Sequence, residues 1–156
     1  MITRILLAVD DSPASMQATR AALELAASLR ARLRVVNVIG DHRLVQTLER
    51  ASGTDDVRRR REVAAASLLD RVAALAHAAG VQVETRRMEG EPARCILAEA
   101  AGWPADLIVI AKSDQHRRAG EPYVGTETAN VLEFAEQPVL VTSPVVGRYP
   151  PASPDR

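Results

Sequence analysis

Two polar segments follow apolar runs in this sequence, and both carry side chains that could bind a ligand or exchange a proton. The Asp10-Asp11 pair ends the first apolar run, and a loop that begins Ala111-Lys112-Ser113-Asp114 ends the most hydrophobic one. That loop reaches a Gly-Thr pair only at Gly125. Glycine suits phosphate-binding loops because it permits positive φ and lets backbone N–H groups approach the phosphate. The loop is therefore a working phosphate cradle, an altered one, or an ordinary surface turn.

The other residue types that could do chemistry are scattered. The Asp10-Asp11 carboxylates could serve acid–base chemistry or a metal, but we favour a ligand contact for Asp10 and a helix-capping role for Asp11. The three histidines, at positions 42, 77 and 116, show no metal-ligand spacing. Cys95 is either a thiol of lowered pKa near a helix start or a small packed side chain, and we favour the second.

A run of four arginines, residues 58–61, could bind an acidic partner or nucleic acid. Four consecutive residues point all around a helix, so we interpret the run as a solvated helix start. The sequence contains no Gly-x-Ser-x-Gly, no Walker-type loop and no Gly-x-Gly-x-x-Gly.

Length and composition fit one ordinary globular domain. The chain has 156 residues, of which 47% are hydrophobic and 26% charged, with a formal net charge of +0. This balance predicts no nucleic-acid or membrane partner. The single cysteine excludes an intramolecular disulfide, and no stretch approaches the length of a membrane span. We therefore expect a cytoplasmic protein.

The elements that must position these residues alternate along the chain. Ser12-Pro13 predicts a helix start, Gly80 a helix end, and Gly90-Glu91-Pro92 another helix start. Strands are expected at residues 5–9, 33–39, 81–87, 107–110 and 139–141, and helices at 13–29, about 58–79, 92–101 and 126–135.

This β-α alternation predicts an α/β domain with a doubly wound parallel sheet, in which ligands bind beyond the carboxyl ends of the strands. The stretch Asp41–Asp56 is weakly patterned and holds at most a short helix around Leu44–Leu48. We place the domain at residues 1–143 and a loose, proline-rich tail at 144–156.

Four segments in this order resemble the universal stress protein family. They are ILLAVDDSPAS, RVVNVI, ADLIVIA and VGTETANVLEFAEQPVLVT. The resemblance implies a single five-stranded flavodoxin-like sheet in the order 3-2-1-4-5, with helices on both faces. It also implies a homodimer that pairs through the last strand, and an ATP site in many members.

The resemblance maps an adenosine contact onto Asp10 and an apolar adenine contact onto Val38. In ATP-binding members a glycine pattern follows the fourth strand, and here its first two glycines are replaced by Ala111 and Asp114. Its third glycine is kept as Gly125, after one extra loop residue. The cofactor-binding residues implied are Ala8, Val9, Asp10, Val38, Ile110, Ala111, Gly125 and Thr126.

The differences from the glycine pattern, and the charged residues around it, have opposite effects on the binding of a phosphate. Ala111 is a mild change if its backbone is ordinary and a costly one if the position needs positive φ. Asp114 and Glu127 place carboxylates where a phosphate would sit. Cationic loop residues could instead close over phosphates, and Mg²⁺ on either carboxylate would reverse the sign of the effect. The cationic residues are Lys112, His116, Arg117 and Arg118.

Three functions follow. The first is a non-catalytic regulatory module in a stress response, which senses a nucleotide or binds a protein partner through an altered ATP loop. The second is a genuine ATP-binding member with slow ATPase or nucleotidyl-type activity that depends on Lys112. The third is an FMN carrier, which the aromatic content of 3% disfavours.

Overall fold

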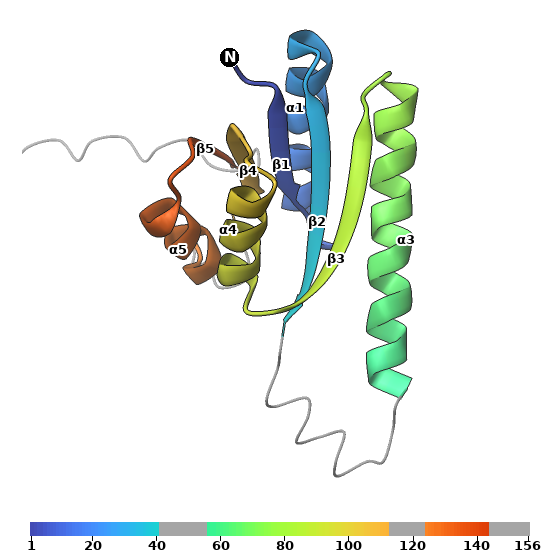
Figure 1. Ribbon diagram of the computed structural model, residues 1–156. Coiled ribbons are helices and arrows are strands. Elements are labelled where there is room, and N and C mark those ends of the chain that lie inside the picture. Colours follow the sequence, from blue (N-terminus) through green and yellow to red (C-terminus); the bar gives the residue numbers. More distant parts are fainter. Residues whose placement is uncertain (41–55, 113–123, 144–156) are drawn as a thin grey trace, which may run out of the picture.

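The computed structural model describes residues 1–40, 56–112 and 124–143 as one α/β domain (Figure 1). Its elements are β1 (Arg4–Ala8), α1 (Pro13–Leu29), β2 (Arg32–Gly40), α3 (Asp56–Ala78), β3 (Val83–Gly90), α4 (Pro92–Gly102), β4 (Leu107–Ala111), α5 (Thr126–Phe134) and β5 (Val139–Thr142). The five strands form one sheet in the order β3-β2-β1-β4-β5, and all four pairings are parallel. The predicted fold class and strand order are confirmed.

Helices cover both faces of the sheet. Alternate residues of β1 point to opposite sides, so that Ile5 and Leu7 pack with α1 and α3, whereas Leu6 packs with α4 and α5. All three side chains are fully buried. This double burial explains why the central strands are continuous apolar runs rather than alternating ones.

The predicted helix boundaries have the expected local causes. Ser12 caps α1, its hydroxyl accepting a hydrogen bond from the Ser15 N–H, and Pro13 is the first helical residue. Glu91 caps α4 through both carboxylate oxygens. After α3, Gly80 has φ of +69°, and the Val81 N–H donates to the Ala76 carbonyl. This is the Schellman arrangement that glycine favours.

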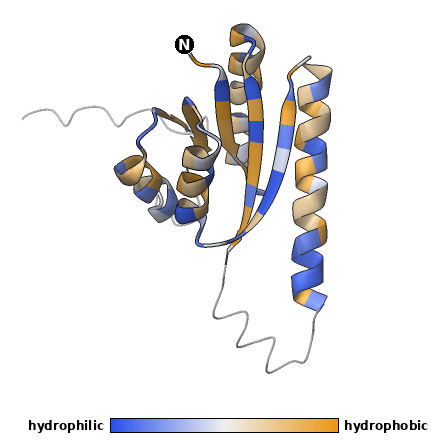
Figure 2. Ribbon diagram, in the orientation of Figure 1, coloured by the Kyte–Doolittle hydropathy of each residue, from blue (hydrophilic) through white to orange (hydrophobic). Residues whose placement is uncertain are grey.

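The outer strand β3 differs from its prediction in its bounds. It begins at Val83 rather than residue 81, because Val81 is buried in the core directly after the Gly80 turn. It extends to Gly90 because β2 continues to Gly40, with which Gly90 pairs. Figure 2 shows that β3 is largely hydrophilic, in contrast to β1, as suits an edge strand.

Several predictions lie outside the described residues: the short helix around Leu44–Leu48, the loop residues Asp114 and 116–118, and the tail at 144–156. Within the described part, no helix is long and apolar enough to cross a membrane.

Candidate functional site

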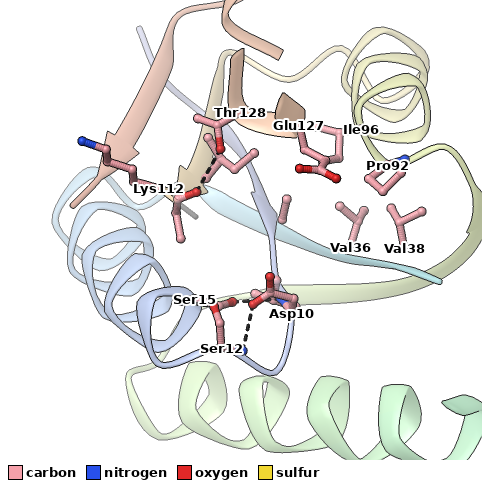
Figure 3. Close-up of a pocket in the computed structure, with 14 residues that line it drawn as sticks. Asp10, Ser12, Ser15, Val36, Val38, Pro92, Ile96, Lys112, Glu127 and Thr128 are labelled. Atoms are coloured by element: carbon pink, nitrogen blue, oxygen red, sulfur yellow. Dashed lines mark hydrogen bonds between the residues drawn. The ribbon is translucent and has the colours of Figure 1, made fainter. Parts of the chain in front are cut away.

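A pocket of about 190 Å³ opens at the carboxyl ends of β1 and β4, where the strand order reverses (Figure 3). Its walls come from the ends of β1, β2 and β4 and from the starts of α1, α4 and α5. The lining residues are Ala8, Val9, Asp10, Ser12, Ser15, Val36, Val38, Pro92, Ile96, Ile110, Ala111, Lys112, Glu127 and Thr128. The pocket lies where ligands are expected to bind in a doubly wound α/β sheet.

Asp10 is held in place by the start of α1. Its Oδ1 accepts a hydrogen bond from the Ser12 N–H at 2.9 Å, and its own N–H donates to the Ser15 hydroxyl at 3.0 Å. The Ser12 hydroxyl in turn accepts from the Ser15 N–H at 3.2 Å. This ring of hydrogen bonds orients the carboxylate. Its Oδ2 accepts no hydrogen bond from the residues that the structure describes, so it can accept one from a ligand.

The wall opposite Asp10 is apolar. Val36, Ile96 and Ile110 are buried, and Val38 is half-buried at the end of β2. Beneath them, the buried Asn37 amide donates to the Val9 carbonyl at 2.8 Å and so ties β2 to the end of β1. A flat apolar group can pack against this wall while a polar edge faces Asp10.

At Ala111 the backbone is an ordinary strand. The residue pairs with Thr142 in β5, and its carbonyl accepts a hydrogen bond from the Thr128 hydroxyl at 3.2 Å. The described non-glycine residues include only one with positive φ, Arg30. The replacement of glycine at Ala111 is therefore the mild change and imposes no backbone strain.

The start of α5 carries the residues that face a phosphate in the resemblance. Gly125 is its N-cap, with φ of +77° and no side-chain capping hydrogen bond. Thr126 is exposed and, like Gly125, does not line the pocket; a ligand contact of either residue stays a prediction. The pocket is instead lined from α5 by Glu127 and by the buried Thr128.

The structure thus brings six of the predicted residues into one pocket: Ala8, Val9, Asp10, Val38, Ile110 and Ala111. Sequence reasoning missed those contributed by helix starts and by the apolar wall: Ser12, Ser15, Val36, Pro92, Ile96 and Thr128. The spacing of Ser12 and Ser15, N-cap and third helical residue, was the one available signal. Nothing in the sequence identified Pro92 or Ile96 as pocket residues. They reach the pocket because α4, which connects β3 to β4, packs beside it.

Two alternatives for other residues are corrected. Burial, together with the Glu91 carboxylate, raises the pKa of the Cys95 thiol, so the alternative of a lowered pKa is wrong. The Cys95 thiol is half-buried and donates to the Glu89 carbonyl at 3.6 Å. Ser12 caps α1 as predicted, but the Asp11 side chain makes no hydrogen bond within the described residues, so the capping role that we also expected of Asp11 is not seen there.

The arginine run begins α3, as predicted. Arg58 pairs with Glu62 at 3.4 Å and with Glu89 at 3.6 Å, and Arg60 pairs with Asp56 at 2.9 Å. All four arginines are exposed or half-buried. Across residues 1–40, 56–112 and 124–143, no cluster of three or more histidine, cysteine or acidic residues could hold a metal ion.

Residues 1–143 match the model of the universal stress protein family. A solved structure of a family protein from Burkholderia pseudomallei is 28% identical, with a TM-score of 0.65 over 90% of this chain and 95% of that one. Universal stress protein UspA from Lactobacillus plantarum is 25% identical, with a TM-score of 0.69 over 90% and 97%.

A universal stress protein from Archaeoglobus fulgidus, solved in complex with dAMP, is 20% identical, with a TM-score of 0.66 over 91% and 98%. No curated protein matches the sequence significantly. The match to the family model spans every described residue, and the sheet has the strand order that the resemblance implied. This chain therefore belongs to the universal stress protein family.

Proposed function

We propose that this protein is a non-catalytic regulatory module that binds the adenosine part of a nucleotide or nucleoside in the pocket at the carboxyl ends of β1 and β4. One observation carries the proposal: Asp10 is anchored opposite an apolar wall, with one carboxylate oxygen that accepts no hydrogen bond from the described residues. Ribose hydroxyls or an amino group would donate to Asp10, and the base would pack on Val36, Val38 and Ile96. The dAMP complex of the Archaeoglobus fulgidus relative supports this ligand class.

The proposal of no turnover rests on the composition of the pocket. Phosphoryl transfer needs cations or metal ions that neutralise charge on the transferred group. Among the described residues that line the pocket, Lys112 is the only cation, and Glu127 opposes it with a carboxylate. ATP hydrolysis above background that is lost in a Lys112→Ala variant would overturn the non-catalytic part of the proposal.

We also propose that two copies pair through β5. This strand is a free edge of the described sheet and carries Leu140, which is 36% exposed. Leu132 and Phe134 on the neighbouring α5 are 46% and 64% exposed. An apolar edge of this kind favours strand pairing with a second chain. Light scattering should give a dimer mass for the native chain and a monomer mass for Leu140→Arg.

The ligand proposal is tested by denaturing freshly purified protein and assaying the released small molecules. The stripped protein is then titrated with adenosine, AMP and ATP, each with and without Mg²⁺. We expect saturable binding of at least one of these compounds with one site per chain. No released nucleotide and no binding of any of them at millimolar concentration would refute the proposal.

A further inference from the structure

Two carboxylates face the same pocket from opposite walls. Asp10 follows β1, and Glu127 is the second residue of α5. Figure 3 shows the Glu127 carboxylate extending toward the middle of the pocket, between Ile96 and Val36. The Lys112 ammonium points away from the other labelled residues. The described part of the pocket therefore presents acceptors and negative charge to a ligand, and its only cation is turned outward.

The position of Glu127 matters because a helix N-terminus attracts anions. The free N–H groups and the helix dipole favour negative charge within the first turn. Gly125 supplies no side-chain cap to α5, so the charge in this turn belongs to Glu127. The carboxylate thus stands where a phosphate of a ligand would gain most, and two like charges at contact distance repel.

We propose that Glu127 makes this pocket selective for a neutral nucleoside over the same nucleoside carrying a 5′-phosphate. A nucleoside offers amino and hydroxyl donors to the carboxylates of Glu127 and Asp10 and brings no charge of its own. Esterification of the 5′-hydroxyl removes a donor and adds a charge that Glu127 repels. The inference rests on the proposed adenosine site and names its ligand class.

The test is calorimetric titration of the full chain with adenosine, AMP and ATP in the absence of Mg²⁺. In the native protein, adenosine should bind at least about fivefold more tightly than AMP. Two unit negative charges in contact in water repel each other enough to weaken binding by about this factor. Raising the salt concentration should narrow this ratio, because salt screens the repulsion between exposed charges.

Glu127→Gln keeps the size of the side chain and one acceptor oxygen, replaces the other oxygen by an amide donor, and removes the charge. It should tighten AMP binding by about fivefold and bring the adenosine-to-AMP ratio close to one. The matched control is Glu133→Gln, which makes the same change on an exposed residue of α5 that does not line the pocket. It should leave the ratio unchanged. Glu127→Ser serves as a second variant should the glutamine variant fold poorly.

The outcomes separate this inference from the proposed function. AMP or ATP binding as tightly as adenosine in the native protein would overturn the selectivity and leave the adenosine site standing. The same holds if Glu127→Gln leaves the ratio unchanged. If none of the three compounds binds, the selectivity and the proposed function fail together.

Discussion

The two ends of the sheet use charged side chains in opposite ways. At the amino end, the Asp106 carboxylate accepts from the Thr3 N–H, the Thr3 hydroxyl and the Arg4 N–H at 2.8–2.9 Å. At the carboxyl end, Asp10 accepts one backbone hydrogen bond, and Glu127 accepts none within the described residues. The fold thus satisfies the Asp106 carboxylate, whereas Asp10 and Glu127 accept fewer hydrogen bonds from the described residues and keep acceptor capacity for a ligand.

A second cluster at the amino end also ties charged side chains to the fold. Arg34 stacks on the Trp103 ring at 4.5 Å, pairs with Glu99 at 2.8 Å, and also pairs with Glu84. The Arg34 and Glu99 side chains are only 15% and 10% exposed. This cluster fastens the end of α4 to β2 and β3, so its charges serve the fold.

This contrast implies that residues at the amino end of the sheet contribute to stability, whereas residues at the carboxyl end contribute to ligand binding. Substitutions at the amino end should cost stability and leave affinity for adenosine unchanged. Substitutions at the carboxyl end should change affinity and leave stability nearly unchanged. Three variants test this separation, in order of decreasing expected effect.

The largest effect is expected for Arg34→Met. The methionine keeps the apolar stem but leaves the nearly buried Glu99 with Arg86, 3.8 Å away, as its one ion-pair partner among the described residues. Breaking a buried pair on one side costs about 3 kcal/mol of unfolding free energy, which urea denaturation would measure. Arg32→Met is the control: the Arg32 side chain is 53% exposed, and its loss should cost at most about 1 kcal/mol. Weaker adenosine binding by folded Arg34→Met would break the separation.

A smaller effect is expected for Asp10→Asn, and it should appear in binding. The amide oxygen can still accept from the Ser12 N–H, so stability should hold. The hydrogen bond from the ligand to a charged acceptor is weakened, which should lower affinity for adenosine by about tenfold. Asp11→Asn removes the neighbouring charge outside this pocket and should bind as the native chain does. A large loss of stability without loss of affinity would contradict a binding role for Asp10.

The smallest effect concerns the acid dependence of stability. Hydrogen bonds from Thr3, and then from Arg4, hold the pKa of the Asp106 carboxyl below its ordinary value. A carboxyl whose pKa is lower in the folded state stabilises above its unfolded pKa of about 3.9, and this contribution is lost as the pH falls towards the folded value. Asp106→Asn should therefore flatten the decline in melting temperature below about pH 4. A curve parallel to the native one would show that Asp106 contributes no acid dependence.

Much of the fold was predictable because its causes are local. Buried strands appear as continuous apolar runs, and Ser12, Gly80 and Glu91 mark helix ends through capping chemistry. The bounds of β3 were not predictable, because they depend on how far β2 extends beside it. That length is a tertiary property that no residue of β3 encodes.

The site was predictable only where it follows strand ends. Asp10 and Ala111 were found because ligands in this architecture bind beyond the carboxyl ends. At the start of α5 we predicted Gly125 and Thr126 as binding residues and the Glu127 carboxylate at the phosphate position; the pocket is lined by Glu127 and by Thr128, which we did not name. Side chains two positions apart on a helix point about 200° away from each other around its axis. Which of them faces the pocket therefore depends on how α5 packs on the sheet.

The most direct test of the account maps adenosine binding onto the two ends by NMR. Backbone amide shifts of the labelled full chain are followed during a titration. We predict saturable shifts that cluster at Asp10, Ser12, Val38, Lys112 and Glu127, with Thr3, Arg34 and Trp103 unmoved. Shifts centred on the amino end of the sheet, or none at millimolar adenosine, would contradict the account.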